Sequence, residues 1–411
     1  MARISAFKAI RPVRDKVHLV ATRPYYSYKQ NVLKAKLEDN PFTLLRIINP
    51  EFESEKHTAP NSPERFELVK EKYAEFIKEG VLFQDTEAHL YIYRQTKGDH
   101  IFTGVIAGAS VEEYENDLIR KHEATLTSRE EMFTTYLDIV GYNAEPVLLA
   151  HPHHTGVQHL LNDCTAKRPE YEFTTTDRVK HELWVVNQEL TNKLQEAFLE
   201  IPVTYIADGH HRSASSAGLK KRRALHGNSS FPNEDYFLAF FIDEEVLQIL
   251  EFNRIVKTLN GLTSEEFITK LSRSFDVLPI NEFQKPAHEH LMSMCLDGKW
   301  YSLKCHSNIV DENHPVRCLD AEILTQFVLT PILGINDLKT DENIEFVSGA
   351  EPISKMEEKI ASSKFRVAFV LYPVAMEEVK CVADNHMIMP PKSTWVEPKL
   401  RSGLTIYNIN E

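Results

Sequence analysis

The sequence predicts a mixed α/β fold, because helical and strand-like segments alternate along its 411 residues. Between the helix-start signal Asn61-Ser62-Pro63-Glu64 and Gly80, apolar residues recur at helical spacing. Short apolar runs at residues 236–242 and 365–372 are rich in aromatic and aliphatic side chains, which is typical of buried strands. These observations together indicate helices packed on sheets.

The first half of the chain continues this alternation. The run Val17-His18-Leu19-Val20-Ala21 is strand-like, and residues 90–94 and 101–106 predict two strands joined by a turn at Lys97-Gly98-Asp99. A capping signal at Ser110 predicts a helix that runs to about residue 120, and a second signal at Thr127 begins another helix.

The middle of the chain reads strand, helix, strand and helix, at residues 178–186, 188–199, 203–206 and 212–219. Beyond Gly261 the α/β pattern begins afresh, with helices predicted at 264–273 and 321–329 and strands at 300–304 and 365–372. We therefore expect two regions, residues 1–260 and a C-terminal α/β region at residues 261–411.

Composition favours a small-molecule substrate over nucleic acid. The net charge is −13, and the longest basic run is Lys220-Lys221-Arg222-Arg223. Five scattered cysteines without a Cys-x-x-Cys pair fit a reducing compartment. The first residues lack a signal-peptide pattern, and no apolar run reaches the ~20 residues that span a bilayer. We expect a cytoplasmic protein that binds neither nucleic acid nor membrane.

The most informative segment is Asp208-Gly209-His210-His211-Arg212, which follows an apolar strand and opens a helix. Gly209 allows a tight turn, after which backbone N–H groups and the helix dipole would point at one spot and suit a phosphate. His210, His211 and Arg212 would add charge-assisted donors, and Asp208 could hold Mg²⁺ or orient a histidine. The alternative is a corner with a solvated polar cap, but its density of polar and charged residues favours phosphate binding.

Two other segments contain groups that could act in catalysis or bind a metal. Glu123 follows a predicted helix, so it could accept a proton in catalysis or simply lie at a solvated helix end; the residues alone favour the helix end. The cluster His151-Pro152-His153-His154, with His159, could bind a metal. It lacks a His-x-x-x-His spacing and an internal carboxylate, so we expect a loop near the phosphate turn instead.

Several motifs together resemble the DUF1015 family over nearly the whole chain. They are Ile10-Arg11-Pro12, Tyr91-Ile92-Tyr93-Arg94, Thr103-Gly104-Val105, Lys121-His122-Glu123-Ala124-Thr125, Pro146-Val147, Asn253-Arg254 and Met389-Pro390-Pro391-Lys392-Ser393-Thr394. Ala207-Asp208-Gly209-His210-His211-Arg212 resembles the nucleotide-phosphate turn of ParB/sulfiredoxin-like proteins. The segment Thr22-Arg23-Pro24-Tyr25-Tyr26-Ser27 departs from the family's usual apolar-Pro-Pro-Tyr-Asp turn.

The resemblance implies a ParB/sulfiredoxin-like core with large elaborations and kinship with free-serine kinases. It implies a phosphotransfer enzyme that acts on free serine or O-phosphoserine, in the kinase or phosphatase direction. Mg²⁺ would assist, with ATP or ADP as a phosphoryl donor for a kinase. Glu123, Asp208 and His122 would be catalytic, and Gly209 to Arg212 would bind phosphate. The residues expected at the substrate are Arg23, Tyr25, Asn253, Arg254, Lys392, Ser393, Thr394 and Lys399.

A ParB-like regulator that binds a nucleotide without turnover is the alternative, although we find no basic DNA-reading helix. A sulfiredoxin-like repair enzyme would need a cysteine beside the turn, and this turn has none. A homo-oligomer is compatible with either function. We expect the C-terminal segment from Met389 through Lys399 to return to the site, with its two prolines stiffening a loop that covers an anionic ligand.

Overall fold

A nine-stranded sheet organises the first of two units in the computed structural model, which describes residues 1–55, 57–227 and 231–411. Unit 1 contains residues 1–121, 125–247 and 398–411, and unit 2 contains residues 122–124 and 248–397. The division differs from the expected boundary at residue 260. Strand β13 (Gln248–Val256) already pairs within unit 2, and the last residues of the chain return to unit 1.

The strand directions of unit 1 decide where its loops lie. In spatial order the strands are β6 (Ile119–Arg120), β11 (Thr204–Asp208), β8 (Val147–His151), β12 (Tyr236–Asp243), β5 (His100–Ser110), β4 (Tyr91–Lys97), β10 (Val179–Val185) and β9 (Tyr171–Thr174), and β1 (Ile4–Ser5) pairs with β5. Strand β8 runs antiparallel to β11 and parallel to β12. The turn after β11 therefore lies near the start of β8, whereas the loops after β8 and β12 lie at the opposite edge.

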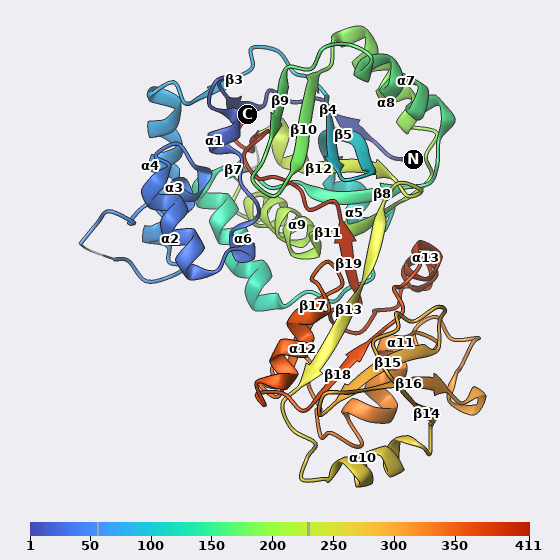
Figure 1. Cartoon of the computed structure of the whole chain (residues 1–411). Coiled ribbons are helices and arrows are strands. Elements are labelled where there is room, and N and C mark those ends of the chain that lie inside the picture. The colour runs from blue at the N-terminus through green and yellow to red at the C-terminus, as the bar shows by residue number, and fades with distance from the viewer. Residues whose placement is uncertain (56, 228–230) are drawn as a thin grey trace. The chain divides into compact units, whose positions relative to one another are not determined.

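Helix α4 (Pro63–Lys78) illustrates how local sequence sets the helices of unit 1 (Figure 1). The Ser62 hydroxyl accepts a hydrogen bond from Arg65 N, Pro63 occupies the first turn, and Phe66 and Tyr73 lie on the buried face. The other helical segments are α1 (Val17–Val20), η1 (Tyr25–Ser27), α2 (Gln30–Asp39), α3 (Leu44–Ile48), α5 (Val111–Glu115), α6 (Thr127–Val140), α7 (Thr155–Thr165), α8 (Gln188–Phe198), α9 (His210–Leu225) and η2 (Pro232–Asp235).

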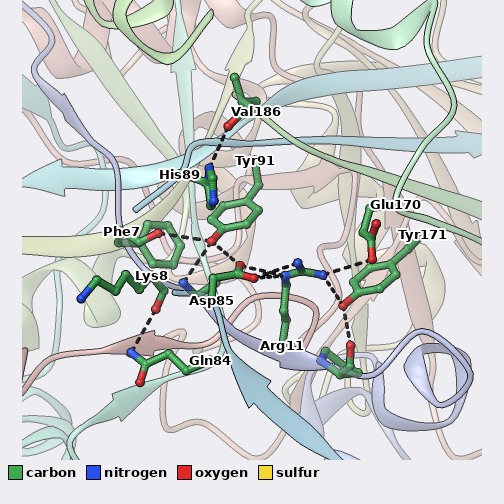
Figure 2. Close-up of polar contacts among 12 residues, drawn as sticks. Phe7, Lys8, Arg11, Gln84, Asp85, His89, Tyr91, Glu170, Tyr171 and Val186 are labelled. Atoms are coloured by element: carbon green, nitrogen blue, oxygen red, sulfur yellow. Dashed lines mark hydrogen bonds and ion pairs between the residues drawn. The ribbon is translucent and has the colours of Figure 1, made fainter. Parts of the chain in front are cut away.

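A buried polar network fixes the N-terminal segment onto unit 1 (Figure 2). Strand β2 (Ile10–Pro12) pairs with β3 (Leu82–Gln84), and Arg11 is only 7% exposed. Its guanidinium donates to both oxygens of Asp85, at 2.7 and 2.8 Å, and to the Tyr171 hydroxyl at 2.8 Å. Tyr91 also donates to Asp85, at 2.8 Å, so this carboxylate joins segments that are distant in sequence.

The seven-stranded sheet of unit 2 has its own core. Its strands, in spatial order, are β14 (Phe275–Ile280), β16 (Lys299–Cys305), β15 (Leu291–Leu296), β18 (Val367–Val370), β13 and β17 (Ile344–Ser348), and β19 (Thr394–Glu397) pairs with β13. Its helical segments are α10 (Ser264–Leu271), η3 (Ser307–Ile309), α11 (Asp320–Leu324), the π-helical turn η4 (Thr325–Leu329), α12 (Ser354–Ala361) and α13 (Met376–Asp384).

The predicted α/β class is confirmed, and two local predictions are wrong. Residues 17–20 form helix α1 instead of a strand, because Val20 packs into a core with Leu44 and Ile47 of helix α3. The helix that begins after Ser110 ends at Glu115, since Asp117 takes a left-handed conformation (φ 58°) and the chain then enters β6. Within the described residues, no helix is long and apolar enough to cross a membrane.

Candidate anion-binding turn

The turn between β11 and α9 has the geometry that the sequence predicts. Gly209 has φ 110°, and a Cβ placed there would lie 3.1 Å from the guanidinium carbon of Arg212. Glycine thus permits both the left-handed backbone and the return of Arg212 over the turn. Helix α9 begins at His210, and Gly209 has no side chain with which to cap it. The positive end of a 16-residue helix therefore lies at this corner.

Two cations from distant segments meet at Asp208. Lys399 Nζ lies 3.2 Å from Asp208 Oδ2, and Arg212 Nη2 lies 3.7 Å from Asp208 Oδ1. Arg212 also donates to the carbonyl of Pro146 and lies 3.7 Å from Glu145 Oε1, just before β8. Burial opposes ionisation of Asp208, but Lys399 and Arg212 outweigh it and lower the pKa of the carboxyl below its usual value.

Lys399 is held in place by the backbone around it. Its carbonyl oxygen accepts a hydrogen bond from Gln95 Nε2 at 3.3 Å. Ser402 forms an antiparallel bridge with Thr22, and Arg401 Nη2 lies 2.7 Å from both carboxylate oxygens of Asp177. Strand β20 (Tyr407–Asn408) then pairs with β7 (Tyr142–Asn143). Residues 398–411 are thus built into unit 1, and Lys399 among them lies at the turn.

The two histidines of the turn do not supply the charge that we expect from the sequence. His210 is 4% exposed, and burial, against the attraction of Asp208, lowers its pKa to about 3. His211 Nε2 accepts a hydrogen bond from Leu126 N at 3.2 Å, at the start of α6. A ring nitrogen that accepts a hydrogen bond carries no proton, so His211 Nε2 cannot donate to a phosphate and instead contacts the start of α6. The cations at the turn are Arg212 and Lys399.

The same geometry makes Asp208 a poor ligand for Mg²⁺. Its two oxygens face Lys399 and Arg212, and each cation would repel a divalent ion. Among the described residues, one cluster of three metal-ligating side chains is found, and it does not include Asp208. Asp208 instead orients the two cations beside the helix N-terminus.

The predicted residues Glu123 and His122 belong to unit 2. The carbonyl of His122 accepts a hydrogen bond from Met389 N at 2.8 Å, and its side chain is buried. Glu123 is half-buried. The segment 122–124 is therefore hydrogen-bonded to the Met389-Pro390 motif, although the two motifs lie far apart in sequence. The catalytic role of Glu123 and His122 stays a prediction.

The C-terminal motif forms more regular structure than the expected loop. Lys392 has a left-handed backbone (φ 59°), and its ammonium lies 5.4 Å from the centre of the Phe252 ring. Ser393 donates its hydroxyl to Pro390 O at 2.7 Å. Thr394 begins β19 and is the register partner of Glu251 on β13. Residues 394–397 of the expected covering loop thus form a paired strand, and only the rest of the segment is loop.

The remaining predicted substrate residues have structural partners. Asn253 Oδ1 accepts a hydrogen bond from Leu371 N, and Arg254 is fully buried with its guanidinium 5.5 Å from the Phe346 ring centre. In unit 1, the Arg23 guanidinium lies 4.9 Å from the Tyr28 ring centre, and Tyr25 is 47% exposed. Because Thr22 bridges to Ser402, this loop is joined to the segment that carries Lys399.

The histidine cluster lies away from the turn, contrary to expectation. Asp208 is the register partner of Leu148 near the start of β8, whereas His151 ends that strand. His153 and His154 follow beyond it. The antiparallel pairing of β8 with β11 therefore puts the cluster at the opposite edge of the sheet.

The fold and the turn define a mixed α/β protein with two cations beside a helix N-terminus. The chain belongs to the family described as "Protein of unknown function (DUF1015)", whose model matches residues 4–322, and this confirms the resemblance seen in the motifs. No curated protein shows significant similarity to it.

Three solved structures illustrate how distant its structural neighbours are. A free serine kinase in complex with AMP is 12% identical over 74% of this chain and 91% of that chain, with a TM-score of 0.36. SbnI with a C-terminal truncation, from Staphylococcus aureus, is 14% identical over 74% and 87%, with a TM-score of 0.39. A conserved hypothetical protein from Pyrococcus furiosus is 14% identical over 73% and 95%, at 0.33. Similarities at such scores carry no argument about function.

Proposed function

We propose that this protein is a phosphotransfer enzyme that acts on free serine or O-phosphoserine, and that it binds the phosphoryl group at Asp208 to Arg212. The observation that carries the proposal is the convergence of Arg212 and Lys399 on the N-terminus of α9. Backbone N–H groups at a helix start and two cations are a combination that binds phosphate.

An incoming phosphate would exchange with existing ion pairs. Arg212 and Lys399 are partly exposed, at 19% and 25% of their side chains, so a ligand can reach them. Asp208 holds both cations until a phosphate replaces it as their partner. The exchange keeps both cations paired but leaves the Asp208 carboxylate beside a second anion, which favours protonation of Asp208 when phosphate binds.

Phosphoryl transfer needs positioned donors and one acid or base, and little covalent help from the protein. We assign the acid or base to Glu123 by its resemblance to the catalytic glutamate of free-serine kinases. The same resemblance suggests serine or phosphoserine as substrate. The donors at the turn support phosphate binding, and the serine part rests on the motifs alone.

One assay tests the proposal directly. Purified protein with Mg²⁺ is incubated with O-phosphoserine in one arm and with serine plus ATP, ADP or pyrophosphate in the others. Release of phosphate or formation of phosphoserine supports the proposal and identifies the direction. Nucleotide binding without turnover in any arm would favour a regulator, and absence of both binding and turnover would remove the turn from consideration.

Variants of Arg212 connect the assay to the turn. Arg212→Ala should weaken binding of the phosphorylated ligand by roughly 1.5–3 kcal/mol, the scale of a hydrogen bond to a charged group. Arg212→Ala also removes the contacts of Arg212 with Glu145 and Pro146, which could lower stability. Arg212→Lys keeps a cation, so comparing the two variants separates an effect on ligand binding from an effect on stability. Arg222→Ala, near the other end of α9, is the matched control. Unchanged affinity in folded Arg212→Ala would contradict the assignment.

A further inference from the structure

A histidine and two carboxylates converge where β8 and β12 leave the sheet of unit 1. Strands β8 and β12 are parallel neighbours, with His151 and Asp243 as register partners at their ends. His153 lies two residues beyond β8, Asp243 ends β12, and Glu245 lies two residues further. The pairing of the two strands thus brings together His153 and Asp243, which are 90 positions apart in sequence.

The three side chains are close enough to share one ion. His153 Nδ1 lies 2.6 Å from Asp243 Oδ2 and 3.5 Å from Glu245 Oε2, and the three ligand atoms lie within 4.8 Å of one another. Metal–ligand bonds of roughly 2.0–2.2 Å place neighbouring ligand atoms about 3.0–3.4 Å apart. Small side-chain rotations would therefore create room for an ion between the three atoms.

The surroundings orient the central carboxylate toward that position. Asp243 is 6% exposed, and its Oδ1 accepts a hydrogen bond from Glu245 N at 2.9 Å. This bond leaves Oδ2 directed at His153. His153 and Glu245 are 43% and 67% exposed, so an ion could enter from solvent and keep water ligands. Buried, hydrogen-bonded carboxylates that hold a ligand in place are typical of built metal sites.

We propose that His153, Asp243 and Glu245 bind one divalent transition-metal ion, of the class of Zn²⁺ or Mn²⁺. An imidazole nitrogen beside two carboxylates favours such ions over Mg²⁺, which takes oxygen ligands. The other histidines of the cluster have different partners. The His151 ring packs against Phe198, and His154 accepts from Val157 N at the start of α7. One histidine of the cluster therefore ligates.

This site is separate from the phosphate turn and does not rest on the proposed function. Leu148 is level with Asp208, and His153 lies five residues further along the chain, which corresponds to roughly 15 Å of extended strand. The ion would join the loops after β8 and β12, so we assign it a stabilising role. Arg212→Ala should leave its binding unchanged.

The experiment uses the full chain, freed of metal with a chelator and dialysed against ZnCl₂, MnCl₂ or MgCl₂. The proposal expects one Zn²⁺ or Mn²⁺ per chain, with Mg²⁺ held at least about tenfold more weakly. His153→Gln and Asp243→Asn should each lower the affinity at least tenfold, the scale for loss of a ligand or its support. His159→Ala, an exposed histidine on α7, is the matched control.

A second readout separates metal binding from a simple ion pair. An ion that binds only the folded state raises the melting temperature. Zn²⁺ or Mn²⁺ should raise it in the unaltered chain and in His159→Ala, and should not in His153→Gln. His153 is half exposed, so this variant should fold even if Asp243→Asn does not. No binding by the unaltered chain, or equal binding by His153→Gln, would overturn the proposal and leave a His–Asp ion pair.

Discussion

Lys399 Nζ lies 3.2 Å from Asp208 Oδ2, although the two residues are 191 positions apart in sequence. This contact connects the C-terminal segment to the strand–turn–helix corner that the sequence singles out. It also helps to lower the pKa of the Asp208 carboxyl, against the opposing effect of its partial burial. The corner is therefore composed of two segments: residues 208–212, which local sequence identifies, and the segment that carries Lys399, which it does not.

Lys399→Met tests the part of Lys399 in ligand binding, since methionine keeps the aliphatic stem and removes the ammonium. We expect the affinity for the phosphorylated ligand to fall roughly 10- to 100-fold, consistent with loss of a charge-assisted hydrogen bond. The pKa of Asp208 should rise, because the nearer of its two cations is lost while burial remains. Titration of ligand binding over pH measures both effects. Lys8→Met, which removes a lysine paired with Glu411, is the control.

Glu123→Gln keeps the shape of the side chain and removes its ability to accept a proton. If Glu123 is the acid or base, turnover should fall roughly 10²–10⁴-fold with little change in ligand affinity. Glu131→Gln, at an exposed position of α6, should have no such effect. Turnover within a few-fold of the unaltered protein would mean that Glu123 has no part in proton transfer and that another group moves the proton.

His181 predicts how stability depends on pH. It is fully buried, with Nδ1 2.8 Å from the Tyr93 hydroxyl and Nε2 accepting from Arg401 Nε at 3.2 Å. Burial, assisted by Arg401, lowers its pKa from 6.5 to about 3. The unfolded chain therefore binds a proton that the folded chain refuses, and stability present above pH 6.5 is lost as the pH falls toward 3.

The expected size of this loss is about 1.4 kcal/mol per pH unit within that window. Denaturant unfolding at pH 7.5, 5.5 and 4.5 measures it. His181→Gln should be less stable at pH 7.5 but should show a shallower decline, whereas the exposed His226→Gln should leave the slope unchanged. An equal slope in His181→Gln and the unaltered protein would show that His181 titrates normally.

The Arg11–Asp85 pair predicts a large stability effect far from the turn. Removing one partner leaves a buried charge without compensation, so Asp85→Asn should cost roughly 3–5 kcal/mol in the free energy of unfolding. The double variant Arg11→Leu/Asp85→Leu should recover part of that loss. Glu112→Gln removes half of an exposed pair with Arg3 and should change stability little. Equal effects of Asp85→Asn and Glu112→Gln would contradict a structural role for the network.

Local signals predicted most elements of the fold near their observed bounds. The Ser62 cap, the turn at residues 97–99 and the apolar run at 236–242 each depend on interactions within a few residues. The exceptions were helix α1 and the early end of the helix after Ser110. Helix α1 was predicted as a strand because so short a segment has no period of its own, and it takes the conformation that buries Val20.

By itself, the sequence determined the α/β class and the strand–Gly209–helix corner, and its motifs indicated the family. All of these follow from short-range backbone preferences and from residue patterns. Tertiary structure alone decided that Lys399 pairs with Asp208, that His210 is buried and neutral, and that Asp243 and Glu245 join His153. Each of these depends on strand direction and register, which are set by packing between segments far apart in sequence.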